Sequence, residues 1–160
     1  MNSQVAETSI ADRELMITRL INAAPEKVYR AWTEPALLKQ WFAPAPWQVV
    51  SAETDVRPGG ISMIAMRGPD GNELPNRGVY LEVVPNEKLV FTDAYTEAWV
   101  PSEKPFMTVI LTFENEGGRT RYTARVRHFT VAVREAHERM GFYQGWGQCT
   151  TQLEKLVATL

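Results

Sequence analysis

Three side chains of the types that carry protons in enzymes lie within predicted β-strands. Asp93 supplies a carboxyl group, Tyr122 a phenol and His128 an imidazole. Such groups act as general acids or bases when they reach the reacting atoms of a substrate. Asp93 lies on a different predicted strand from Tyr122 and His128, which share one strand. Only a fold that brings at least two of the three groups together would support acid–base chemistry.

Each of these side chains also has a structural interpretation. For His128 we favour a histidine that is hydrogen-bonded at the rim of a sheet. For Asp93 we favour a strand end that emerges into solvent, because an inward carboxylate would need a partner or a proton. His137 is predicted to lie on the surface, because it is opposite Trp146 on the C-terminal helix.

The residue types that metal sites and nucleophilic catalysis require are scarce. The chain has two histidines and a single cysteine, Cys149, without the spacing of a zinc site. It also lacks the nucleophile elbow, the phosphate-binding glycine loop and the dinucleotide-binding fingerprint. We therefore assign no catalytic residue, no metal and no cofactor from the sequence.

The composition is typical of one globular domain. The chain has 160 residues, of which 44% are hydrophobic, and a formal net charge of −2, whereas nucleic-acid binders normally carry a basic excess. No apolar run reaches the roughly 20 residues that cross a bilayer, and Met1–Asp12 lacks the pattern of a secretory signal. We expect a cytoplasmic protein that neither binds nucleic acid nor inserts into a membrane, with a flexible tail at residues 1–12 and one domain at residues 13–160.

The predicted elements follow the order strand, two short helices, six strands and one long helix. Pro25 and Pro35 suit the first positions of the two short helices, and the second helix ends near Trp41. Short connections with Gly and Pro turn signals separate the later strands, which implies antiparallel pairing. The predicted strands are Arg13–Ile21, Trp47–Val56, Ile61–Met66, Gly78–Val84, Leu89–Ala94, Phe106–Glu114 and Thr120–Phe129, and the long helix covers about Val131–Ala158.

The long helix must bury an apolar stripe against the sheet, which gives a two-layer α+β domain. Gly141, Gly145 and Gly147 each lower helix propensity by up to about 1 kcal/mol relative to Ala, so we expect a bend near them. The stripe consists of Phe142, Tyr143, Trp146, Cys149, Thr150, Leu153, Val157 and Leu160.

Strand alternation predicts an inner sheet face that is apolar with a few polar groups. In the last strand, a buried face with three arginines would be very costly, so Tyr122 and His128 point inward. The other inward sets are Ile61, Met63 and Ala65; Val79, Leu81 and Val83; Leu89, Phe91 and Asp93; and Met107, Val109, Leu111 and Phe113.

Apolar walls with sparse polar groups are typical of a small-molecule pocket, although the same residues would also fill a solid core. Trp32 and Trp41 are assigned to core packing, and the long loop Tyr95–Pro105 is a candidate mobile flap. The predicted ligand-binding residues are Trp47, Met63, Val79, Phe91, Asp93, Tyr95, Trp99, Met107, Tyr122, His128, Tyr143 and Trp146.

An ordered set of segments resembles the START-like, or SRPBCC, superfamily. Ala24–Trp32 (APEKVYRAW) is similar to the first helix of that superfamily. Asp55–Gly60 (DVRPGG), Glu87–Phe91 (EKLVF) and the pair Gly145-Trp146 resemble the branch related to the activator of the heat-shock protein 90 ATPase. The resemblance extends from about residue 13 to residue 160.

This resemblance implies the helix-grip fold, a curved seven-stranded antiparallel sheet with two short helices and one long C-terminal helix. It also implies that a hydrophobic small molecule is the expected partner. A polyketide-cyclase-like enzyme and a chaperone ATPase-activator-like protein partner are the alternatives, because members of the superfamily have these roles. A homodimer is compatible with a domain of this size.

Overall fold

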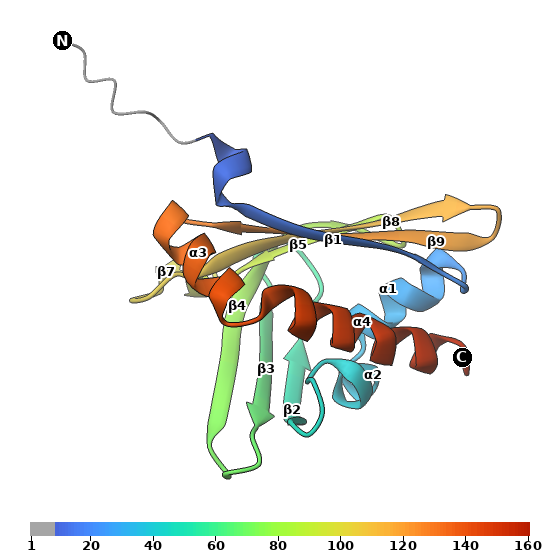
Figure 1. Cartoon of the computed structure of the whole chain (residues 1–160), viewed down its shortest axis with the longest axis horizontal. Helices are drawn as coiled ribbons and strands as arrows, with labels where there is room; N and C mark the ends of the chain where they lie inside the picture. The colour runs from blue at the N-terminus through green and yellow to red at the C-terminus, as the bar shows by residue number, and fades with distance from the viewer. Residues whose placement is uncertain (1–8) are drawn as a thin grey trace.

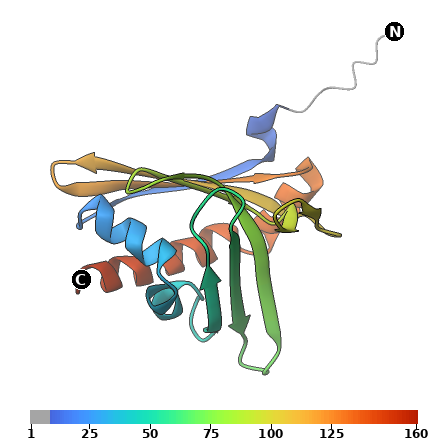
Figure 2. The same ribbon diagram turned by 180° about the vertical axis from the view of Figure 1, so that it is seen from behind.

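The computed structural model describes residues 9–160 and consists of a curved antiparallel sheet with helices on its concave face (Figures 1 and 2). The strand order is β1-β9-β8-β5-β4-β3-β2, so β1 and β2 form the edges. The predicted seven-stranded helix-grip fold is confirmed. The elements are η1 (Ile10–Arg13), β1 (Glu14–Ile21), α1 (Pro25–Thr33), α2 (Pro35–Trp41), β2 (Gln48–Thr54), β3 (Ile61–Arg67), β4 (Glu73–Val84), β5 (Lys88–Thr92), β6 (Tyr95–Glu97), β7 (Val100–Pro101), β8 (Met107–Glu116), β9 (Arg119–His128), α3 (Val131–Arg139) and α4 (Phe142–Val157).

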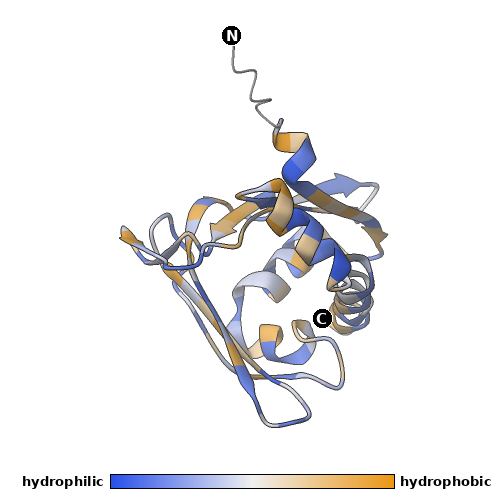
Figure 3. Ribbon diagram, turned by 60° about the vertical axis from the view of Figure 1, so that its left-hand side comes forward, coloured by the Kyte–Doolittle hydropathy of each residue, from blue (hydrophilic) through white to orange (hydrophobic). Residues whose placement is uncertain are grey.

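The sheet bends so that β2, β3 and β4 turn away from the plane of β1, β8 and β9 (Figure 1). Figure 3 shows the helices lying within the concave side of the bent sheet. The small hairpin β6–β7 lies within the long segment predicted from the sequence to be a candidate mobile flap. Among residues 9–160, no helix has both the length and the apolar character needed to cross a membrane.

The predicted inward set of β4 is wrong at two positions, and a β-bulge explains why. The register of β4 against β5 shifts between Tyr80 and Glu82, so Tyr80 joins the buried core while Leu81 is 43% exposed. A bulge adds one residue to a strand and reverses the alternation beyond it. Val79, predicted inward, therefore lies on the opposite face from Tyr80, while Val83 does pack against the core.

The predicted inward set of β3 is also wrong. Ile64 belongs to the buried core and pairs with Ala52 of β2, which packs against the same core. Met63, predicted inward, pairs instead with the exposed Glu53. Both faces of this strand are apolar, so alternation alone could not distinguish them.

The predicted long C-terminal helix is two helices. Gly141 has a φ of 96°, which glycine adopts at little cost and other residues rarely adopt, and it separates α3 from α4. Tyr143, predicted on the buried stripe, is 49% exposed; it follows the buried Phe142 by one residue, a rotation of about 100° around α4. The rest of the stripe is buried or partly buried and packs against the core. The Cys149 thiol donates to the Phe42 carbonyl oxygen at 3.3 Å. Burial raises the pKa of that thiol to about 12.

The N-terminal segment is more ordered than predicted where the structure describes it. Residues 10–12, assigned to the flexible tail, form the 3-10 helix η1, and the Asp12 carbonyl oxygen accepts a hydrogen bond from Arg134 Nε of α3 at 3.1 Å. Residues 1–8 of the predicted tail lie outside the described residues.

The centre of the domain is filled by aromatic side chains. Trp32 packs against Trp41 at 4.8 Å, Phe42 at 5.7 Å and Phe91 at 5.6 Å between ring centroids. Its indole N–H donates to the hydroxyl of Tyr122 at 3.1 Å. Tyr122 is 1% exposed and burial raises the pKa of its phenol, so this residue is structural. The assignment of Trp32 and Trp41 to the core is confirmed.

We predict that Tyr122→Phe lowers the free energy of unfolding by about 1–3 kcal/mol, because the buried Trp32 N–H loses its only acceptor. Urea unfolding followed by tryptophan fluorescence measures this change. Tyr143→Phe is the matched control, since its half-exposed hydroxyl leaves stability within about 0.5 kcal/mol of the parent. Equal stability of Tyr122→Phe and the parent protein would contradict the structural role of the Tyr122 hydroxyl.

Candidate functional site

A cavity of about 270 Å³ opens at one end of the aromatic core, between β3, β4 and β5 and the hairpin β6–β7. It lies away from the centre of the domain, where the sequence placed the cavity, because the aromatic cluster occupies that centre. Its lining comprises Phe42, Ser62, Ile64, Pro75, Asn76, Arg77, Gly78, Phe91, Thr92, Asp93, Thr96, Ser102, Lys104 and Met107.

The inner wall of the cavity is apolar and is continuous with the core. Phe42 follows α2 and packs edge-on against Trp41 at 5.7 Å. Phe91 of β5 packs edge-on against Tyr80 at 6.4 Å. Ile64 from β3 and Met107 from β8 complete this wall. Apolar side chains already fixed by core packing form a preformed surface for an apolar ligand.

Asp93 is the single carboxylate among the described residues that line the cavity. Its Oδ1 atom accepts hydrogen bonds from the backbone N–H of Phe106 at 2.8 Å and of Met107 at 3.0 Å. Burial raises the pKa of Asp93, and these two N–H groups act in the opposite direction. A side chain at Gly78 would collide with the backbone of Thr92, so glycine allows the chain that carries Asp93 to cross closely over β4.

Two cations and the hairpin form the mouth of the cavity. Arg77 of β4 is exposed, and its Nε donates to the Thr96 carbonyl oxygen at 3.4 Å. Lys104 follows the hairpin and is also exposed. Trp99, at the tip of the hairpin, packs edge-on against Tyr95 at 5.7 Å and is 80% exposed. The hairpin therefore borders the mouth with its polar residues and directs Trp99 into solvent.

The two histidines lie together, which corrects the prediction that His137 is on the surface. His128 Nε2 is 2.9 Å from His137 Nδ1, and His128 Nδ1 is 2.8 Å from the carbonyl oxygen of Arg13. Phe106 and Phe142 pack against His137 at 4.8 and 5.1 Å between ring centroids. The break between α3 and α4 at Gly141, one of the glycines where the sequence predicted a bend, brings these rings together.

The hydrogen bonds fix the tautomers of the neutral pair. A carbonyl oxygen only accepts, so His128 carries its proton on Nδ1 and His137 donates from Nδ1 to the bare Nε2 of His128. Burial lowers the pKa of both imidazoles, and His128 adds to the effect on His137, whose pKa is about 4. The prediction that His128 is hydrogen-bonded at the rim of the sheet is confirmed.

The structure brings together only part of the predicted ligand-binding set. Phe91, Asp93 and Met107 line the cavity. Met63 and Val79 lie on faces opposite to those predicted, and Tyr122 is held within the core. The remaining predicted residues do not line this cavity: Trp47 packs on Gly68, Tyr95 and Trp99 lie on the hairpin, His128 pairs with His137, Tyr143 is exposed and Trp146 stacks on Phe142.

Sequence reasoning missed most of the polar lining. The predicted inward set Ile61, Met63 and Ala65 left Ser62 on the outer face. In the structure Ser62 shares the cavity-facing row of β3 with Ile64. Asn76 and Arg77 lie on the first part of β4, which extends five residues before the predicted start at Gly78. No signal in the sequence placed Lys104 at this cavity, because its position depends on the path of the chain after the hairpin.

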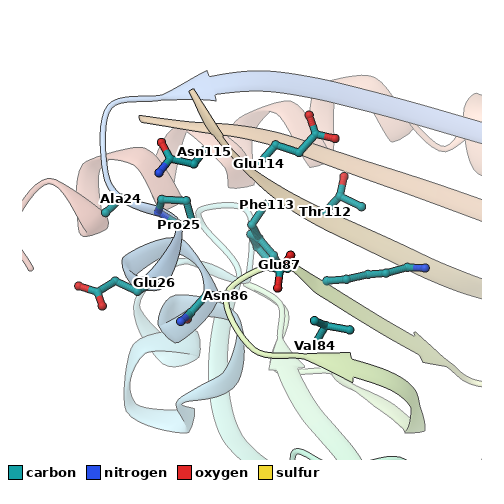
Figure 4. A pocket seen from close by; sticks show the side chains of 11 residues that line it. Ala24, Pro25, Glu26, Val84, Asn86, Glu87, Thr112, Phe113, Glu114 and Asn115 are labelled. Atoms are coloured by element: carbon teal, nitrogen blue, oxygen red, sulfur yellow. The ribbon is translucent and has the colours of Figure 1, made fainter. Parts of the chain in front are cut away.

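A second hollow, shown in Figure 4, is a wide surface groove beside the start of α1 and the β4–β5 turn. The buried ring of Phe113 forms part of its base, whereas Glu26 and Glu114 point in different directions. Because its polar groups diverge, this groove is a weaker candidate than the cavity beside Asp93.

Comparisons with known proteins agree on the family. A sequence model of the family described as "Activator of Hsp90 ATPase homolog 1-like protein" matches residues 22–158. A crystal structure of a Nitrosomonas europaea protein is 40% identical, with a TM-score of 0.90, over 93% of this chain and 96% of that one. No curated protein matches the chain.

Two further structures share the fold. A crystal structure from Rhodobacter sphaeroides is 22% identical, with a TM-score of 0.82, over 93% of this chain and 95% of that one. An NMR structure of an AHSA1-like protein from Aeromonas hydrophila is 20% identical, with a TM-score of 0.68, over 91% of this chain and 92% of that one.

We predict that Asp93→Ala increases amide hydrogen exchange at Phe106 and Met107 by at least about tenfold, because each buried N–H that loses its acceptor costs about 1–3 kcal/mol. Asp93→Asn is the matched control, since its amide oxygen still accepts both bonds. NMR exchange rates distinguish the variants, and unchanged exchange in Asp93→Ala would contradict the role of this carboxylate.

We predict that His137 lowers the free energy of unfolding as the pH falls from 6.5, the ordinary pKa of histidine, to about 4, its pKa in the folded protein. The unfolded chain binds a proton in this window and the folded chain does not, so acidification favours unfolding. His137→Gln removes this contribution, and its free energy of unfolding therefore has a shallower pH dependence than that of the parent. Identical pH profiles by urea unfolding would contradict the buried, neutral histidine.

Proposed function

Because the chain belongs to the Activator of Hsp90 ATPase homolog 1-like family, we propose that its helix-grip domain binds a small, largely apolar molecule in the cavity beside Asp93. Membership in this family supports a ligand-binding or activator-like role. The observation that carries the proposal is the cavity itself, with its apolar inner wall and its few polar groups at the mouth. This composition is usual for small-molecule sites.

The volume of the cavity limits the size of the ligand. About 270 Å³ corresponds to about nine water molecules at about 30 Å³ each, and is just below the range of about 300–1,000 Å³ for most ligand pockets. The ligand is therefore about as large as a single ring or a pair of fused rings, and smaller than a long lipid chain.

Binding is favoured over cyclase chemistry by the positions of the three proton-carrying side chains. Of the three, only Asp93 lines the cavity. Tyr122 is bonded to Trp32, and both ring nitrogens of His128 are occupied by hydrogen bonds. Family membership alone supports a chaperone contact, and no described surface identifies the face that would make it.

We predict that Met107→Trp abolishes binding of the neutral aromatic probe 2-naphthamide, because the larger ring fills the cavity. Overpacking costs about 1–3 kcal/mol of stability, so the variant remains folded. Binding is measured by isothermal titration calorimetry, together with chemical-shift changes at Ser62 and Phe91. Native mass spectrometry of freshly purified parent protein tests for a ligand that co-purifies.

Met16→Trp is the matched control, because it makes the same substitution on the edge strand β1, where Met16 is 41% exposed and does not line the cavity. It is expected to bind the probe as the parent does. Binding that survives in Met107→Trp, or a parent protein that binds no such probe, would exclude this cavity as the ligand site.

A further inference from the structure

The mouth of the cavity carries two cations that the fold leaves without ion-pair partners. Arg77 and Lys104 both line the cavity and are exposed. Most arginines in the described part of the chain form ion pairs with carboxylates. Arg67 at the end of β3, for example, pairs with Glu73 at the start of β4 at 2.7 Å. Arg77 and Lys104 form no salt bridge with any residue in 9–160.

Arg77 is the cross-strand partner of Met63, and its guanidinium reaches Thr96 of the hairpin, which also lines the cavity, with donors to spare. The bond from Nε to the Thr96 carbonyl oxygen, at 3.4 Å, uses one of five N–H groups. The two terminal amino groups stay available, and their planar arrangement matches the two oxygens of a carboxylate.

The charge of the cavity lining has the opposite sign to that of the chain. The lining contains two cations, Arg77 and Lys104, and one carboxylate, Asp93. The Oδ1 atom of Asp93 already accepts hydrogen bonds from two backbone N–H groups. The sequence as a whole has a formal net charge of −2. A positive concavity on an acidic protein concentrates anions at that point.

We propose that the ligand carries one anionic group, a carboxylate or a chemically similar oxyanion, on its small apolar body. The inference rests on the ligand-binding function proposed above and specifies the class of its ligand. The apolar body contacts Phe42, Phe91 and Met107, and the anion binds Arg77 with Lys104 beside it. A neutral ligand would leave both cations facing water, and a cationic ligand would be repelled by them.

Two probes that differ only in charge test this proposal. 2-Naphthoate and 2-naphthamide have the same fused rings and nearly the same shape, and calorimetry measures the affinity of each for the parent protein. A charge-assisted bond contributes about 1.5–3 kcal/mol, so we expect the naphthoate to bind about 10- to 100-fold more tightly than the amide. Added salt should weaken only the naphthoate.

Arg77→Gln should reduce the affinity for 2-naphthoate to nearly that for 2-naphthamide, and leave the affinity for the amide unchanged. Lys104→Gln should have a smaller effect in the same direction. Arg119→Gln is the matched control for net charge, because Arg119 begins β9 directly after the β8–β9 turn and does not line the cavity. Its affinities for both probes should equal those of the parent.

The outcomes separate this inference from the proposed function. Equal affinity for both probes, or a charge preference that survives in Arg77→Gln, overturns the anion-binding inference while ligand binding stands. An equal loss of naphthoate affinity in Arg119→Gln also overturns it, because the effect would then come from net charge. If neither probe binds, the proposed function fails and the inference fails with it.

Discussion

The architecture depends on the burial of Trp32 between two short helices and the concave sheet. Its ring contacts Trp41, Phe42 and Phe91, and its N–H is satisfied by Tyr122. A ring of this size joins α1, α2, β5 and β9 in one packed unit, and the single polar atom of the indole has its acceptor inside that unit. The same packing decides where empty space is left, because the rings fill the centre and the cavity opens only at one end.

Much of the fold was predictable because its signals are local. Proline positions began both short helices, turn signals separated the strands, and three arginines on one face of β9 identified its inner row. The bulge at Leu81 was not predictable, because one added residue leaves the apolar pattern of β4 looking regular. The inner row of β3 was equally hidden, since Met63 and Ile64 are similar in polarity and only the neighbouring strand distinguishes them.

The candidate site was less predictable than the fold, for a physical reason. Phe91, Asp93 and Met107 were found because they continue inward rows of the sheet. Arg77 and Lys104 reach the cavity from its rim, where the path of the hairpin determines the neighbours and alternation carries no information. His137 was misplaced because one glycine with positive φ separates α3 from α4, and a continuous helix would have carried that ring elsewhere.

The environment of Cys149 has a practical consequence for studies of this protein in solution. The thiolate is the nucleophile that attacks a thiol-reactive label. With a pKa of about 12 in a half-buried position, the Cys149 thiol is almost entirely protonated at neutral pH. Cys149 is the only cysteine in the sequence. The native chain therefore reacts very little with such labels, and a cysteine introduced at Ser102, directly after the hairpin, would take up a fluorophore or spin label selectively.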